Sequence, residues 1–344
     1  MKYRVLNAAD DAEDWHNCLQ RCPMIMGDIY YQPEYVELHC LFADSKGVLF
    51  VYEDSGQIWF NAVVLSPVGN GFYDVETPYG YGGPISNVTN TVFLCAAREA
   101  YSAWLHEMSV IAELTRFHPL LNNGEAEDPD TERIFNRQTL SIDLCQPPAF
   151  SGRALNSIKR ARNGGVEVKM LPVIEHIGHF QKLYEDNMRA VKADEFYFFD
   201  DVYYQGLAKL VEHNGMLLVA MLDGEWLSAS LFLRGTNWLH YHLAGANFEA
   251  RIPGSQNLII HTAAEMGHKA GLELLHLGGG RTTAVDDSLF FFKQAMATDQ
   301  HKFYIGKRVV NQEQYDGLVD NWRNDNPALV EKYKNHLIPY RKTI

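Results

Sequence analysis

The stretch Leu217-Leu-Val-Ala-Met-Leu-Asp-Gly-Glu-Trp-Leu-Ser-Ala-Ser-Leu-Phe-Leu233 decides the fold of the second half of the chain. Two runs of strand-forming residues flank Asp223-Gly224, a dipeptide that supplies the positive φ angles of a tight hairpin turn. A second turn at Gly235-Thr-Asn leads into another strand-like run, Trp238–Ala244. The sequence therefore predicts three consecutive antiparallel strands.

Helices and further strands surround these three strands. Before them, the spacing of apolar residues predicts a strand at 165–171 and helices over about 174–192 and 200–213. After them, we expect a helix over 256–270, a buried strand at 272–277, a helix from Asp287 to about 296 and a strand over 302–310. Hairpins come first and a strand–helix–strand crossover comes later, so the order predicts a mixed sheet with helices on both faces.

The first half repeats this order more loosely. Its strand-like runs lie at 3–6, 47–52, 57–66, 73–77, 110–117 and 139–144, and its helical stretches at about 11–20, 33–42 and 90–108. We therefore expect an α/β fold, an α+β mixed sheet built twice in tandem. Pro147-Pro148 marks the expected junction, with domains at 1–147 and 148–311. The segment 312–344 is expected to carry a polar, amphipathic helix over about 312–335 that packs back on the first domain.

Composition and charge limit the class of protein. The 344 residues are 47% hydrophobic and 21% charged, which is typical of a globular chain. The formal net charge of −13 comes entirely from residues 1–150, so no general electrostatic field attracts nucleic acid. The apolar run Met216–Leu222 is far shorter than the roughly 20 residues of a membrane-spanning helix. With no signal-peptide pattern and five cysteines without zinc-site spacing, we expect a cytoplasmic protein with no metal and no integral membrane contact.

Four stretches carry a family resemblance: Tyr73–Pro84 (with Thr-Pro-Tyr-Gly-Tyr-Gly-Gly-Pro), Arg116-Phe-His-Pro119, His240–Gly245, and Gly278-Gly-Gly followed by Asp287-Ser-Leu-Phe-Phe-Phe-Lys293. Together with the order of elements, they resemble the Fem-type subfamily of the GNAT acyltransferases. The resemblance covers nearly the whole chain. It implies two tandem GNAT-like domains and the transfer of an acyl or aminoacyl group to an amine, with no tightly bound cofactor.

The loop before the 256–270 helix is the expected binding site of the donor's phosphates. The resemblance places a pyrophosphate at this helix N-terminus, where backbone amides and the helix dipole favour an anion. Gln256 departs from the family pattern, which has a small residue there, and Pro253 removes one amide donor. An ordinary loop and helix cap is the alternative. The candidate donor-binding residues here are Arg251, Gly254, Ser255, Gln256 and Asn257.

A basic cluster at the start of the second domain is a second candidate phosphate site. Lys159 and Arg162 lie three residues apart, so they share one face of a helix and can hold one phosphate between them. The resemblance also implies basic residues near this position that grip a phosphorylated ligand. The alternative is a solvated helix end whose cations interact favourably with the helix dipole.

The remaining candidates surround the expected reacting groups. Lys293 follows three phenylalanines, and a desolvated lysine can stabilise developing negative charge; the alternative is a lysine whose ammonium reaches solvent. His118 and His242 are candidate general bases, although a lone histidine is more often structural. The candidate substrate-binding residues are Tyr79, Tyr81, Arg116, Gly279 and Gly280; for the two tyrosines, a rigid structural turn is the alternative.

We therefore predict an N-acyltransferase that binds its acceptor, a small or cell-envelope-related amine, between the two domains. Acyl-CoA is the favoured co-substrate because the chain is acidic. An aminoacyl-tRNA-dependent transferase acting on a peptidoglycan precursor is the alternative, and a non-catalytic sugar- or peptide-binding module on the same fold is a further one. The sequence does not identify the acceptor or the acyl group.

Overall fold

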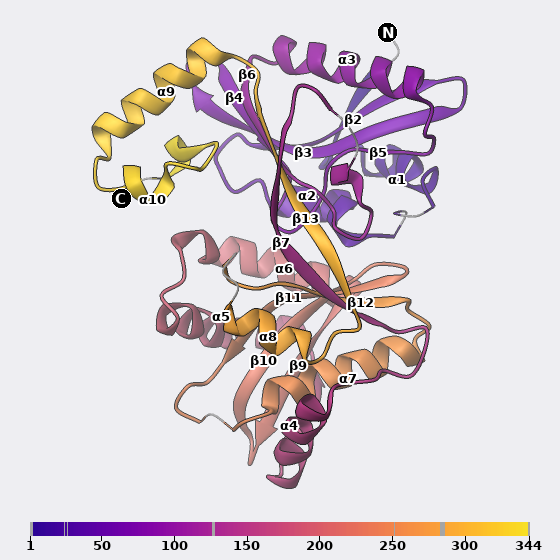
Figure 1. Cartoon of the computed structure of the whole chain (residues 1–344), viewed down its shortest axis with the longest axis vertical. Coiled ribbons are helices and arrows are strands. Elements are labelled where there is room, and N and C mark those ends of the chain that lie inside the picture. Colours follow the sequence, from indigo (N-terminus) through magenta and orange to yellow (C-terminus); the bar gives the residue numbers. More distant parts are fainter. Residues whose placement is uncertain are drawn as a thin grey trace. The chain divides into compact units, whose positions relative to one another are not determined.

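A computed structural model describes residues 3–23, 25, 27–125, 128–250, 252–282 and 286–342. Its contacts divide the chain into two compact units, which we describe separately (Figure 1). Unit 1 comprises Met1–Met26, Tyr30–Asn136 and Phe303–Ile344. Unit 2 comprises Gly27–Ile29 and Arg137–Lys302. Among the described residues, no helix has both the length and the apolar character that crossing a membrane requires.

This division differs from the boundaries expected at Pro147-Pro148 and before residue 312. Strand β7 (Glu132–Asp143) begins in unit 1 and ends in unit 2. Strand β13 (Asp299–Val309) does the reverse, because it begins in unit 2 and ends in unit 1. Residues 139–143 of β7 pair with a strand of unit 2, which assigns them to that unit before the two prolines are reached. Pro147-Pro148 therefore comes after the end of β7 at Asp143, inside unit 2, and does not separate the two units.

Unit 2 contains the three antiparallel strands that the sequence predicts. Its sheet has the strand order β7-β12-β11-β10-β9-β8, and all neighbours are antiparallel except β11 and β12. Its elements are α4 (Gly152–Asn163), β8 (Glu167–Leu171), α5 (Val173–Ala190), α6 (Asp201–Asn214), β9 (Gly215–Leu222), β10 (Glu225–Arg234), β11 (Trp238–Ala246), α7 (Ser255–Lys269), β12 (Leu274–Gly279) and α8 (Ser288–Gln294).

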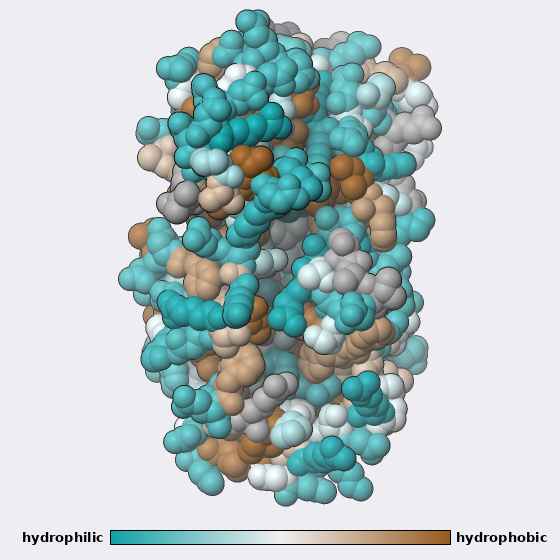
Figure 2. Space-filling view, turned by 60° about the vertical axis from the view of Figure 1, so that its left-hand side comes forward, coloured by the Kyte–Doolittle hydropathy of each residue, from teal (hydrophilic) through white to brown (hydrophobic). Residues whose placement is uncertain are grey.

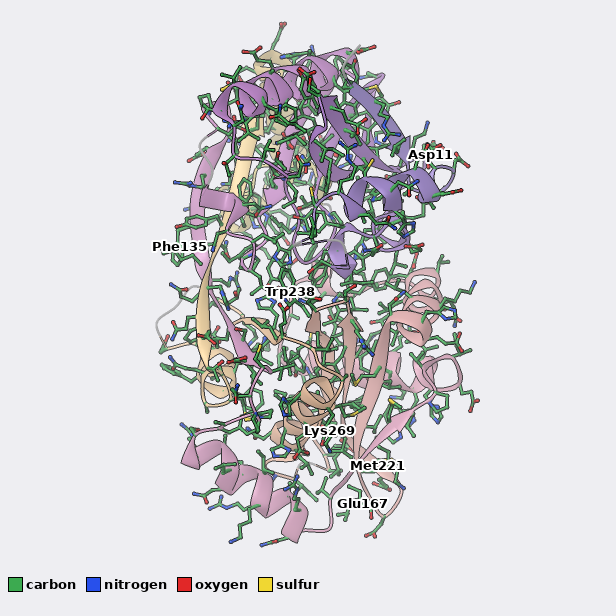
Figure 3. All side chains as sticks on the ribbon, turned by 90° about the vertical axis from the view of Figure 1, so that its right-hand side faces the viewer. Asp11, Phe135, Glu167, Met221, Trp238 and Lys269 are labelled. Atoms are coloured by element: carbon green, nitrogen blue, oxygen red, sulfur yellow. The ribbon has the colours of Figure 1, made fainter. Side chains whose placement is uncertain are left out.

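The turn between β9 and β10 forms as predicted. Asp223 and Gly224 have φ angles of 50° and 86°, the left-handed conformation that a two-residue hairpin loop requires. Leu222 pairs with Glu225 directly across this turn. At the other edge of β9, Glu167 of β8 pairs with Met221, and Figure 3 labels both residues near the end of these strands.

Helices cover both faces of the unit 2 sheet because its central strands alternate apolar residues on two sides. Leu218 and Ala220 belong to the core that α4 and α7 complete. The residues between them, Leu217 and Val219, are equally buried and point to the opposite face, where α5 and α6 pack (Figure 1).

Strands β11 and β12 separate part of the way along their length. Their parallel pairing runs from Trp238 with Leu274 to His240 with His276. Beyond this point β11 stays paired with β10 through Ala246, while β12 stays paired with β7. Within the described residues, β11 after His240 and β12 after His276 therefore no longer pair with each other, and the facing backbone edges of the two strands separate.

Unit 1 repeats the plan with the strand order β1-β2-β3-β4-β6-β13, and β5 pairs with β3. Residues 48, 50 and 52 face the core under α3, whereas 49 and 51 face the core under α1 and α2. The elements are β1 (Tyr3–Asn7), α1 (Ala12–Gln20), α2 (Pro33–Leu38), β2 (Lys46–Asp54), β3 (Gln57–Gly69), β4 (Phe72–Glu76), β5 (Ile85–Ser86), α3 (Thr91–Glu107), β6 (Val110–Arg116), α9 (Gln312–Asp325) and α10 (Val330–Tyr333).

The C-terminal segment packs on the rest of unit 1. Helix α9 lies against β6. It ends at Asp325, well before the predicted residue 335, because Asn326 precedes a proline and such a residue disfavours the helical conformation. Farther along the chain, the Arg341 guanidinium makes two hydrogen bonds to the buried Asp74 carboxylate, of 2.9 and 2.7 Å. This ion pair fixes the end of the chain to β4.

Candidate functional site

The strongest candidate site in unit 2 lies where β11 and β12 separate. Lys293, on α8, donates from Nζ to the Gly279 carbonyl oxygen at the end of β12, at 2.8 Å. The same Nζ lies 5.4 Å from the ring centroid of Tyr241 on β11. The side chain is 7% exposed, so a buried amine lies close to the ends of both strands.

The segment that holds Lys293 is built on a helix cap. Asp287 accepts hydrogen bonds from the backbone amides of Phe290, at 2.8 Å, and Thr282, at 2.7 Å, so it closes both the first turn of α8 and the preceding loop. A side chain at Gly280 would place its Cβ 2.7 Å from the Asp287 carboxylate. The glycine therefore allows the loop to close on the cap, and residues 283–285 lie outside the described part.

Burial makes the Lys293 amine unusually acidic. The pKa of Lys293 is lowered from 10.5 to about 7. Loss of solvent is the largest cause; the Asp287 carboxylate raises the pKa in part, and the Arg137 guanidinium lowers it. Arg137 is held beside the site because it donates to the Gly280 carbonyl oxygen at 2.7 Å. Lys293 can therefore exist near neutral pH both as a hydrogen-bonding cation and as a neutral amine.

A hydrogen-bonded side-chain network extends the site along the sheet. The Gln256 carboxamide, in the first turn of α7, donates from Nε2 to the Ser230 hydroxyl at 2.7 Å and to the Tyr241 hydroxyl at 3.0 Å. Burial raises the pKa of Tyr241, so the phenol keeps its proton. The Tyr241 hydroxyl is also hydrogen-bonded to Ser230, so it belongs to this network, and its ring lies beside Lys293.

The other candidate donor-binding residues at the start of α7 have structural partners. Gly254 has a φ of 96°, and a Cβ there would lie 2.1 Å from the Ser157 carbonyl oxygen of α4. Ser255 bonds to the Ile252 carbonyl oxygen through its hydroxyl, at 2.9 Å. The buried Asn257 donates to the Met296 sulfur at 3.4 Å. Arg251, the remaining candidate in this loop, lies outside the described residues.

The basic residues of α4 are exposed and do not join this network. The buried residues of α4, Ala154, Ile158 and Ala161, pack on the α7 side of the unit. Lys159 and Arg162 lie on the exposed part of the helix. Arg162 comes within 3.5 Å of the His261 ring on α7.

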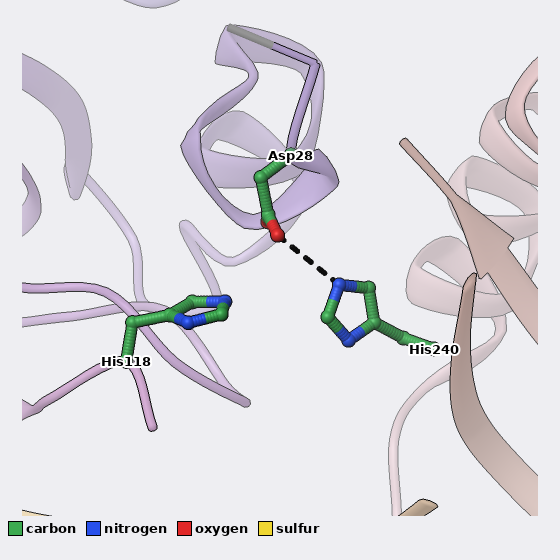
Figure 4. A group of neighbouring side chains, drawn as sticks. All are labelled: Asp28, His118 and His240. Carbon is green, nitrogen blue, oxygen red and sulfur yellow. Dashed lines mark hydrogen bonds and ion pairs between the residues drawn. The ribbon is translucent and has the colours of Figure 1, made fainter. Parts of the chain in front are cut away.

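The histidines of β11 lie on the opposite sheet face from Tyr241. His242 Nε2 is 3.5 Å from the hydroxyl of Tyr203, on α6. His240 Nε2 is 3.1 Å from a carboxylate oxygen of Asp28, and both side chains are 1% exposed (Figure 4). His242, a predicted general base, is therefore separated by the sheet from the Lys293 network.

The predicted substrate-binding tyrosines of unit 1 form part of an aromatic cluster. The Tyr81 ring contacts the rings of Tyr30 and His118 edge-on, with centroids 5.5 and 5.6 Å away. The Tyr79 carbonyl oxygen accepts from the Tyr35 hydroxyl at 2.6 Å. Both candidate tyrosines are only partly buried, so the loop keeps an accessible aromatic surface.

Arg116 and His118 support this loop from the end of β6. Arg116 donates to the Glu76 carboxylate at 3.0 Å and to the Thr77 carbonyl oxygen at 2.7 Å. His118 Nδ1 accepts a hydrogen bond from the Leu120 amide at 3.3 Å, which fixes the ring on the segment that follows β6. The role of His118 as a general base stays a prediction.

The structure thus brings together Lys293, Gln256, Gly279 and Gly280 from the predicted set. It adds Tyr241, Ser230 and Arg137, which sequence reasoning missed. The sequence did hold an indication of Tyr241: it lies between His240 and His242 on a predicted strand, so strand alternation directs it to the sheet face opposite the two histidines. Arg137 has no comparable signal, because it is 143 residues from its partner Gly280.

Comparisons with known proteins identify the fold. No protein-family model matches the sequence, and no curated protein matches it. The crystal structure of FemX matches with a TM-score of 0.69 at 13% identity, over 92% of this chain and 99% of that one. The C-terminal domain of a putative lysylphosphatidylglycerol synthetase from Agrobacterium fabrum matches with 0.55 at 14% identity, over 87% and 93%. A tandem GNAT protein from the clavulanic acid biosynthesis pathway matches with 0.51 at 14% identity, over 89% and 98%. The chain therefore has a Fem-like, tandem GNAT fold, as the sequence predicts.

Proposed function

We propose that this chain is an N-acyltransferase and that unit 2 carries the reaction where β11 and β12 separate. The observation that carries the proposal is the buried Lys293 amine, held on the Gly279 carbonyl oxygen and beside the Tyr241 ring. The Fem-like GNAT fold, an acyltransferase-type fold, supports the same reaction class.

The chemistry needs positioning and charge stabilisation more than a covalent intermediate. The nitrogen of a neutral amine attacks the donor carbonyl, a C–N bond forms, and the bond to the carrier thiol or hydroxyl breaks as the amine gives up a proton. The carbonyl oxygen becomes negative on the way. The Lys293 ammonium is the proposed hydrogen-bond donor for that oxygen, and neutral Lys293 can accept the proton instead.

Acyl-CoA is the first proposed donor, and an aminoacyl-tRNA is the second. One observation favours the second: Gln256 turns its carboxamide onto Ser230 and Tyr241, at the helix start where a CoA pyrophosphate would bind. Gly254 is also covered by the Ser157 carbonyl oxygen of α4. Gln256 and Gly254 at this helix start therefore pack against other residues of unit 2.

The acceptor is proposed to be an amine on a small molecule or on a cell-envelope precursor, and the reaction is proposed to take place in the cytoplasm. The partly buried rings of Tyr79 and Tyr81 are suited to contact a sugar or peptide. If unit 1 binds such a ligand and no donor is consumed, the non-catalytic binding module replaces this proposal.

The test is a donor screen by mass spectrometry. The full chain is incubated with acetyl-CoA, longer acyl-CoAs or aminoacyl-tRNA, with amino sugars and peptidoglycan precursors as acceptors. We expect one donor to be consumed with formation of an amide. Lys293→Met should lower the rate by about 10²–10³-fold, as loss of a transition-state donor does. Lys209→Met, an exposed position on α6, is the matched control. Full activity of Lys293→Met, or no consumption of any donor, contradicts the proposal.

A further inference from the structure

Helix α4 carries an unusual charge for this protein. Its twelve residues, Gly-Arg-Ala-Leu-Asn-Ser-Ile-Lys-Arg-Ala-Arg-Asn, include four cations and no acidic residue, whereas the whole chain has a net charge of −13. The four cations are Arg153, Lys159, Arg160 and Arg162. α4 therefore forms a local basic surface on an otherwise acidic protein.

These four cations extend from the exposed side of α4. All four are exposed to solvent, because α4 is buried on the side that carries Ala154, Ile158 and Ala161. In the part of the chain that the structure describes, none of the four forms an ion pair, and Arg162 comes within 3.5 Å of the His261 ring. In Figure 3, the side chains of α4 extend outward at the lower left.

The helix also exposes an apolar side chain among its cations. Leu155 is 47% exposed and lies four and seven residues before Lys159 and Arg162, so the three share one helical stripe. On the face that Figure 2 shows, apolar residues occur in small separate groups among polar ones. The exposed part of α4 is therefore characterised by its four cations, with Leu155 beside Lys159 and Arg162.

We infer that α4 is a docking surface for an anionic membrane surface. Exposed lysines and arginines are attracted to anionic lipid headgroups, and Leu155, beside Lys159 and Arg162, gains further by entering the boundary of the acyl chains. A nucleic acid would satisfy the cations, but it offers nothing to Leu155, and α4 has no aromatic side chain on which a base could stack. The contact would be peripheral, and it does not depend on the proposed acyl transfer.

The experiment measures binding of the full chain to vesicles by flotation. One vesicle contains equal amounts of phosphatidylglycerol and phosphatidylcholine, and the other contains phosphatidylcholine alone. We expect binding only to the first, weakening as salt rises. The triple variant Arg153→Gln/Lys159→Gln/Arg160→Gln should bind roughly a hundredfold more weakly, at about fivefold for each cation.

Two matched variants decide the outcome. The triple variant Lys182→Gln/Arg189→Gln/Lys209→Gln removes the same charge from α5 and α6 and should bind like the wild type. Leu155→Asn should weaken vesicle binding and leave the binding of a tRNA unchanged. The inference is overturned if anionic vesicles do not bind at low salt or if both triple variants lose binding equally. It is also overturned if Leu155→Asn has no effect on vesicle binding while the α4 triple variant loses tRNA binding, which would make α4 a nucleic-acid surface.

Discussion

Replacing Lys293 by methionine tests the burial of its amine without any knowledge of the substrate. Methionine keeps an unbranched side chain of similar length and removes the titrating group. It also removes the hydrogen bond to the Gly279 carbonyl oxygen, which costs about 1 kcal/mol at every pH. The pH dependence of stability therefore isolates the amine.

The size of the effect follows from the lowered pKa. Burial lowers the pKa of Lys293 from 10.5 to about 7, and each tenfold change in acidity corresponds to about 1.4 kcal/mol. Between these two values the unfolded chain binds the proton and the native chain does not, so the free energy of unfolding rises with pH in this window. When the pH is raised from about 6 to about 9, titration of this group should increase the free energy of unfolding of the wild type by roughly 2–3 kcal/mol.

The assay is urea denaturation followed by tryptophan fluorescence, at several pH values across this range. The difference in unfolding free energy between wild type and Lys293→Met should shift in favour of the wild type as pH rises. Lys209→Met, at an exposed position, serves as the control for the loss of one lysine. A difference between wild type and Lys293→Met that stays constant with pH would show that the amine is solvated and would refute the reasoning about its burial.

Three other substitutions, measured by urea denaturation, test the packing inside unit 1 or inside unit 2. Gly254→Ala should destabilise unit 2 by more than about 2 kcal/mol, because its Cβ would meet the Ser157 carbonyl oxygen at 2.1 Å with a φ of 96°. Gly178→Ala, inside α5 with open space around the new Cβ, should instead stabilise by about 0.5–1 kcal/mol; equal effects at the two glycines would contradict the packing of α4 on α7. Arg341→Met leaves the buried Asp74 carboxylate without its cation and should cost roughly 3 kcal/mol. Limited proteolysis should then cut first in the C-terminal segment, and an unchanged cleavage pattern would speak against its attachment to β4.

The parts of the fold with local causes were predictable from the sequence. Asp223-Gly224 fixes the β9–β10 hairpin because few residue pairs adopt two positive φ angles at low cost. The predicted helix over 256–270 corresponds to α7 (Ser255–Lys269). The predicted helix over 312–335 was wrong in length, because its polar pattern continues past Asn326 while the next residue, a proline, stops the helix.

The parts of the site that depend on distant pairing were not predictable. Asp28 and His240 are 212 residues apart, and nothing local to either residue indicates the other. The irregularity between Leu231 and Phe232 shifts the pairing with β11, so Leu231 pairs with Leu243 and Phe232 with Tyr241. Simple alternation along the two strands cannot give the register beyond such a shift.

The interrupted course of unit 1 along the chain determines which of the two units has all its residues first during synthesis. Except for Gly27–Ile29, unit 2 is one continuous segment that ends at Lys302, whereas unit 1 also needs the residues from Phe303 onward. Since chains emerge from the ribosome at about 5–20 residues per second, unit 2 is complete first. Strand β6 can pair with β13 only after the residues from Phe303 onward have been made, so the sheet of unit 1 is completed after that of unit 2.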